Sequence, residues 1–175
     1  MSKFNTGYIY KFIIFLAGAA ISLAAMPDEM PPSDVKAATA PAPVILPAKA
    51  TRYIVFYSSL QLDFEIDPDS ISIQPGPDGE VRYTLKATSK QGAINVSYEG
   101  IRCSNRQKII YAVGQKNAEW SLSRSPEWSA IYIKGMNIQH AVLANGFFCS
   151  DSSVAGKVAD IVSRLEWKKR LDEKY

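Results

Sequence analysis

The segment EVRYTLKATSKQGAINVSYEGIRCSNRQKIIYAVG, residues 80–114, contains three candidate β-strands separated by two short polar stretches. In its first strand the apolar side chains of Val81, Tyr83 and Leu85 alternate with polar and basic ones. Such alternation is typical of a strand with one buried face and one solvent-exposed face. KQG and SNRQ are composed like turns, so the three strands are expected to form an antiparallel meander.

The middle strand changes its alternation at Gly100. Its apolar side chains occupy even positions up to Tyr98 and odd positions from Ile101 onward. A β-bulge at Gly100 would insert one extra residue and return all of these side chains to the core face. Glu99 would then lie at the bend, on the solvent-exposed face.

The chain before the meander also favours strands. β-Branched and aromatic residues predict strands over residues 53–59, 62–66 and 71–74. DPDS at residues 67–70 has the composition of a turn between two of them. Four acidic residues alternate here, Asp63, Glu65, Asp67 and Asp69, but they lack the ligand spacing of a calcium loop.

The chain after the meander combines short strands with helices. Two short strands are expected around Trp120 and Trp128, followed by a helix over 136–146 that stops at Gly146. A final amphipathic helix is expected to begin at Ser152 or Ser153, with an apolar stripe that includes Ile161 and Leu165. The predicted fold class is α+β, an antiparallel meander with one or two helices packed on one face.

The first 24 residues have the order of a signal peptide. A basic beginning is followed by the uncharged apolar run at residues 12–25, which is short for a membrane span. The spacing of small residues favours cleavage after Ala24, with Ala25 as a close alternative. An uncleaved membrane anchor is the other interpretation; after cleavage no membrane span is expected. The protein is therefore expected in the periplasm.

The mature chain is expected to have two parts. Residues 25–51 are rich in Ala and Pro and predict an extended linker, in which VIL at 44–46 is apolar enough to dock on the domain. Residues 52–175 have the length of a single domain.

The charge balance argues against a nucleic-acid-binding protein. The chain has 20 Lys and Arg against 17 Asp and Glu, and two of the lysines belong to the leader. A nearly neutral mature chain gives no reason to expect nucleic acid as a partner. Residues 81–124 are locally basic, with Glu99 and Glu119 as the acidic residues among eight basic ones. A charged, solvent-exposed sheet face explains this without a ligand, although it could contact an anionic polymer or a lipid surface.

Cys103 and Cys149 are the two cysteines of the chain. In an oxidising compartment an isolated pair predicts a disulfide, worth about 4 kcal/mol in the chain-entropy model. Their separation of 46 residues is unlike a redox motif. With the thiols oxidised and one histidine in the chain, no metal site and no cofactor are predicted.

Candidate functional residues are few. His140, the one histidine, could act as a general base with Glu99 or a nearby acid in a small envelope hydrolase. No serine in a nucleophile elbow accompanies it, so a structural role is favoured. Trp120 and Trp128 are expected to pack over the sheet, with a platform for carbohydrate or peptide as the alternative.

Several motifs, in this order, resemble a known family: DFEIDPDSISI, VRYTL, VSYEGIRC, IIYAVG, the two tryptophans and FFC. They are similar to the cryptic neisserial protein-like family of uncharacterised exported proteins, over roughly residues 62–150. The resemblance implies an envelope location and a cysteine pair, which Cys103 and Cys149 match, but supplies no catalytic residues. The favoured interpretation is a non-catalytic binding or accessory module in the periplasm, acting on an unknown envelope protein or a cell-wall or lipid component.

Overall fold

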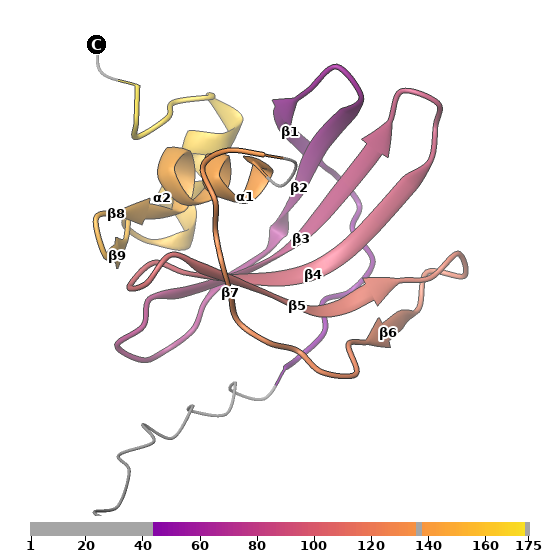
Figure 1. Cartoon of the computed structure of the whole chain (residues 1–175), viewed down its shortest axis with the longest axis horizontal. Coiled ribbons are helices and arrows are strands. Elements are labelled where there is room, and N and C mark those ends of the chain that lie inside the picture. The colour runs from indigo at the N-terminus through magenta and orange to yellow at the C-terminus, as the bar shows by residue number, and fades with distance from the viewer. Residues whose placement is uncertain (1–43, 136–137, 174–175) are drawn as a thin grey trace, which may run out of the picture. The chain divides into compact units, whose positions relative to one another are not determined.

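The computed structural model describes residues 44–135 and 138–173, so the predicted signal peptide and most of the predicted linker lie outside the described residues. An antiparallel sheet forms the centre of the fold, and its strands are hydrogen-bonded in the order β1 to β6, with β7 pairing separately with β5 (Figure 1). The strands of this sheet are β1 (Ile54–Ser58), β2 (Leu62–Ile73), β3 (Glu80–Ser89), β4 (Ile94–Arg102), β5 (Gln107–Gly114), β6 (Trp120–Leu122) and β7 (Ser129–Ala130).

Two helices pack on one face of the sheet, which confirms the predicted α+β class (Figure 1). Helix α1 (Ile138–Leu143) continues directly into a π-helical turn (Ala144–Phe148), so Gly146 lies inside this turn and does not end the helix as predicted. The short strands β8 (Cys149–Ser150) and β9 (Ser153–Val154) form a hairpin before α2 (Val158–Glu166).

The prediction that the last helix begins at Ser152 or Ser153 was wrong. Ser153 belongs to β9, and Gly156, with φ of 91°, turns the chain into α2. The helix begins after Lys157, whose backbone N–H donates to the Asp160 carboxylate at 2.7 Å. Ile161 and Leu165 are buried against the sheet, as the apolar stripe predicted.

Strand β2 is longer than predicted. The DPDS segment does not separate two strands, because pairing with β3 resumes at Ser72 after a break that begins beyond Asp67. Turn chemistry operates inside this break: the Asp69 backbone N–H donates to the Asp67 carboxylate at 3.0 Å. Ser70 bridges the gap by accepting the Thr84 backbone N–H at 2.7 Å, which keeps β2 attached to β3.

The predicted bulge at Gly100 was wrong. Pairing between β3 and β4 runs without interruption from Glu80–Arg102 to Thr88–Ile94. The extra residue lies instead on β5, where Tyr98 pairs with Ala112 and Glu99 pairs with Ile110, leaving Tyr111 between them. Strand β4 therefore keeps its phase, and its even and odd residues face opposite sides.

The sheet has an apolar cluster on each face, so the predicted solvent-exposed face was also wrong. The helical face contains the larger cluster, with Val81, Tyr83 and Ile101 packed against α1, the π-helical turn and α2. The opposite face contains a smaller cluster built on the four buried residues Tyr98, Ile109, Tyr111 and Ala112. The change in the sequence pattern at Gly100 therefore has a different cause: Tyr98, before Gly100, belongs to the smaller cluster, and Ile101, after it, belongs to the larger one.

The docking predicted for VIL at 44–46 is confirmed for two of its residues. Val44 and Leu46 pack on the smaller cluster together with Trp120 and Trp128. This segment helps to bury the face of the sheet that the alternation alone assigned to solvent.

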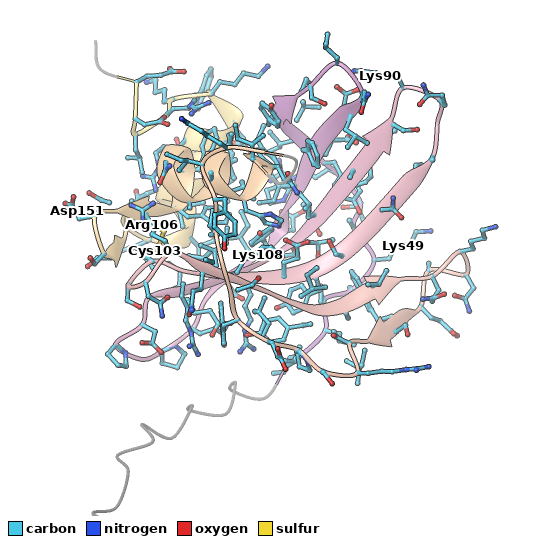
Figure 2. All side chains as sticks on the ribbon, in the orientation of Figure 1. Lys49, Lys90, Cys103, Arg106, Lys108 and Asp151 are labelled. Carbon is cyan, nitrogen blue, oxygen red and sulfur yellow. A yellow bond between two sulfur atoms is a disulfide. The ribbon has the colours of Figure 1, made fainter. Side chains whose placement is uncertain are left out.

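The predicted disulfide is present. Cys103 and Cys149 are bonded, with their Cα atoms 5.4 Å apart, and both side chains are buried (Figure 2). The bond joins the end of β4 to β8. Arg106 supports the same junction by hydrogen bonds to the side chain of Asn145 and to the carbonyl of Asp151.

Candidate functional site

The structure brings His140 and Glu99 together. His140 projects from α1 and Glu99 from β4, and His140 Nε2 lies 2.8 Å from Glu99 Oε2. An ionised carboxylate has no hydrogen to donate, so the bond requires the proton to sit on Nε2. The hydrolase interpretation paired His140 with Glu99 or a nearby acid, but the favoured interpretation left Glu99 on a solvent-exposed face.

Two hydroxyl groups complete the surroundings of Glu99. Tyr83 donates to Oε2 at 3.0 Å and Ser97 donates to Oε1 at 2.6 Å. Burial raises the pKa of a carboxyl, but the hydrogen bonds from His140, Ser97 and Tyr83 outweigh it and hold the pKa of Glu99 below its ordinary value. Burial, together with the neighbouring carboxylate, raises the pKa of Tyr83 well above its ordinary value.

This pair is enclosed in the core. Glu99 is 2% exposed and His140 is 4% exposed, which corrects the prediction that Glu99 lies on a solvent-exposed face. The second ring nitrogen of His140, Nδ1, is buried without a hydrogen-bond partner among the described residues. If His140 were a general base, Nδ1 would take the proton of a substrate or of a nucleophile. A hydroxyl or thiol nucleophile of the protein would then be hydrogen-bonded to Nδ1, and no described residue supplies one.

A second buried polar group lies on the opposite face, from residues that the sequence analysis did not single out. Glu80 accepts hydrogen bonds from Arg82 Nε and from the Tyr111 hydroxyl, both at 2.6 Å. Arg82 is 1% exposed and its guanidinium lies 4.7 Å from the centre of the Tyr111 ring. Burial and the Glu80 hydrogen bond raise the pKa of Tyr111.

Of the two candidate tryptophans, Trp128 lies against this second group and Trp120 lies against Tyr98. The guanidinium of Arg102 lies 3.9 Å from the centre of the Trp128 ring, and Trp128 meets Tyr111 edge to face. Trp120 Nε1 donates to the carbonyl of Pro47 at 3.0 Å. Both tryptophans therefore pack on the smaller cluster.

Trp120 also lines an open cleft of about 480 Å³ on this face, which we call the Trp120 cleft. Its floor is formed by β3 and β4, one wall by residues 49–53, and the other by the turn between β5 and β6. Lys49 marks the first wall in Figure 2. The lining residues are Lys49, Ala50, Tyr53, Thr84, Ile94, Val96, Gly114, Gln115, Lys116, Ala118 and Trp120.

The acidic residues of β2 form no metal site. Asp63 pairs with Lys90 at 2.6 Å and Glu65 pairs with Lys86 at 2.8 Å, while Asp69 pairs with Arg52 at 3.3 Å. Within residues 44–135 and 138–173, no group of three potential ligand side chains could hold a metal ion. In the same residues, no helix is both long enough and apolar enough to cross a membrane.

Sequence comparison identifies the family of this chain. The model of the CNP1-like family matches residues 30–166, which is most of the chain. The chain belongs to the CNP1-like family. This match extends beyond the 62–150 region in which the motifs were recognised, and takes in part of the predicted linker and all of α2.

The chain is also similar to a named relative over part of its length. The CNP1-like chain is 31% identical over 111 residues to cryptic neisserial protein 1 of Neisseria gonorrhoeae, an alignment that covers 56% of this chain. The chain spans about half the length of that relative, because 54% of the relative is aligned. No solved structure matches this chain.

Sequence reasoning missed the lysines that line the Trp120 cleft. Lys49 belongs to the predicted linker, and Lys116 belongs to a turn without a recognisable motif. Nothing in their spacing indicates that the two segments face each other across β4. The linker is held beside β6 by the hydrogen bond between Trp120 and Pro47 and by the packing of Val44 and Leu46 on the smaller cluster.

Proposed function

We propose that this CNP1-like protein is exported to the periplasm and acts there as a binding or accessory module that performs no chemistry. The leader, with its basic beginning, apolar run and small residues, supports export. The disulfide between Cys103 and Cys149 supports the same location, since such bonds persist in oxidising compartments.

One observation carries the binding role. The acid–histidine pair is enclosed in the core, whereas the Trp120 cleft is open and large enough for a small molecule. A small molecule can reach the cleft without any rearrangement of the fold. It cannot reach Nδ1 of His140 in this structure, because that atom is buried.

The hydrolase interpretation keeps one favourable observation. His140 and Glu99 are within hydrogen-bond distance, as a catalytic pair requires. Both are buried, however, and no hydroxyl or thiol of a described residue is bonded to Nδ1. We therefore assign the pair a structural role, in which the Nε2–H of His140 satisfies the buried carboxylate of Glu99 by a hydrogen bond.

Site-specific crosslinking in cells tests the binding role. A photoreactive side chain in place of Lys116 lies on the cleft wall, and the same side chain in place of the exposed Lys134 serves as the control. We expect a discrete adduct from position 116 and none from position 134. Absence of an adduct at both positions, with the protein folded and exported, would contradict the proposed function.

Export has its own test. Mass spectrometry of the mature protein from the periplasmic fraction should find an N-terminus at or next to Ala25. A protein that retains Met1 would show that the leader is an uncleaved anchor, and a protein absent from the envelope would rule out the proposed location.

A further inference from the structure

We propose that the Trp120 cleft binds a small amphipathic anion, that is, one anionic group attached to an apolar body. This inference rests on the proposed binding function and assigns the chemical class of the ligand. It follows from three properties of the cleft: a mostly apolar floor, two unpaired lysines on facing walls, and walls that are held in place by hydrogen bonds.

The floor is mostly apolar, with Thr84 of β3 as its polar residue. Ile94 and Val96 project from β4, and Gly114 at the end of β5 lies against Val96. A Cβ added to Gly114 would lie 3.2 Å from the Val96 Cβ, so a larger residue would push into the floor. Tyr53 and Trp120 contribute aromatic rings to the lining. Such a surface suits an apolar ligand body.

The charge of the cleft is positive and uncompensated. Several basic residues of the sheet pair with carboxylates, namely Arg82, Lys86, Lys90 and Arg102. Lys49 and Lys116 form no ion pair with a described residue, and the described lining includes no Asp or Glu. The two ammonium groups therefore complement an anionic group on the ligand.

Both walls are held in place. The bond from Trp120 Nε1 to the Pro47 carbonyl fixes the segment that bears Lys49. Gln115 donates to the Glu119 carbonyl at 2.7 Å and Ala118 donates to the Gln115 carbonyl at 2.9 Å, which closes the turn that bears Lys116. A ligand would meet a largely pre-formed site, so less of its binding free energy is spent on ordering the protein.

Two dyes with the same body test the ligand class. Anilinonaphthalene sulfonate carries a sulfonate, and N-phenylnaphthylamine is the same aromatic body without it. We expect the full mature chain to bind the sulfonate dye saturably, and the variant with Lys49→Gln and Lys116→Gln to bind it about fivefold more weakly. The same variant should change the affinity for the uncharged dye by less than about twofold. Added salt should lower the affinity of the wild-type protein for the sulfonate dye and leave its affinity for the uncharged dye unchanged.

Two further variants locate the binding. Lys134→Gln removes an exposed lysine outside the cleft and should change the affinity for neither dye. Ala50→Trp fills the cleft from the wall formed by residues 49–53 and should lower the affinity for both dyes. Unchanged thermal unfolding and an intact disulfide would show that each variant is folded.

The outcomes separate the two proposals. If Ala50→Trp blocks both dyes but the lysine variant binds the sulfonate dye normally, the anion class is wrong and the binding role stands. If neither dye binds saturably, or if Ala50→Trp changes the binding of neither dye, the Trp120 cleft is not a ligand site. Both the anion class and the binding role proposed for this cleft are then wrong.

Discussion

Gly100 is required by packing on the face opposite the helices. A Cβ at this position would lie 3.0 Å from the Glu80 carboxylate and 3.1 Å from the Tyr111 ring. Glu80 cannot easily move, because Arg82 and Tyr111 both bond to the same oxygen. We expect Gly100→Ala to lower the free energy of unfolding by about 1–3 kcal/mol in urea denaturation.

Asn95 provides the control for this prediction. It lies exposed on the same strand, and Asn95→Ala should change the unfolding midpoint very little. Equal stability of Gly100→Ala and the wild-type protein would show that the structure around position 100 accommodates a Cβ.

At the residue scale, the sequence predicted the importance of Gly100 but gave the wrong reason. Alternation reports which residues are apolar, and it cannot show that a second apolar cluster covers the other face of the sheet. Glu99 was misplaced for the same reason, since its burial depends on His140, which is 41 residues away in the chain. The pairing of Cys103 with Cys149 was predictable because no other cysteine competes.

At the element scale, the disulfide connects the meander to the C-terminal elements. It closes a loop over a separation of 46 residues, between the end of β4 and β8. We expect replacement of Cys103 and Cys149 by Ala to lower the free energy of unfolding by about 4 kcal/mol, measured by urea denaturation.

A reductant should reproduce this loss in the wild-type protein and have no further effect on the double variant. Mass mapping after alkylation should find no free thiol in folded protein from an oxidising compartment. Two free thiols in such material would refute the role of the bond.

The lengths of the strands and helices were harder to predict than their types. Residues 67–70 have turn composition, and Asp67 does accept the Asp69 backbone N–H, but Ser70 keeps β2 bonded to β3 across the break. Gly146 remains inside the π-helical turn, where Arg170 Nε would lie 3.3 Å from an added Cβ. Both outcomes depend on partners distant in the chain, which local composition does not report.

At the scale of the whole molecule, the buried charge of Glu99 makes stability depend on pH. The folded state holds the pKa of Glu99 below the value near 4.5 of the unfolded chain, so folding favours the ionised form. This contribution is fully present above that pH and is lost as the pH falls through the lower pKa of the folded state. The free energy of unfolding should therefore decrease as the solution is acidified from about pH 5 to about pH 3.

The Glu99→Gln variant isolates this contribution. Other carboxylates titrate in both proteins, so the difference between the two pH profiles reports Glu99 together with the groups bonded to it. We expect a flatter profile for the variant in urea denaturation. Parallel profiles would mean that Glu99 has the same pKa in both states.

For the whole molecule, the sequence predicted an antiparallel α+β fold with a disulfide, and the structure confirms both. The Trp120 cleft was not predictable, since its walls come from segments more than 60 residues apart, as the bond between Trp120 and Pro47 spans 73. The role of His140 likewise follows from its burial, which no local pattern near residue 140 indicates.

We propose that His140 and Glu99 stabilise the fold and take no part in a chemical reaction. A double-mutant cycle in urea denaturation, with His140→Ala and Glu99→Gln, tests it most directly, and the exposed pair of Asp63 and Lys90 gives a control with little or no coupling. We expect His140→Ala to cost about 3–5 kcal/mol and the pair to couple by about 1–3 kcal/mol. Single variants that unfold like the wild-type protein, yet abolish its function in cells, would contradict the account and favour a hydrolase.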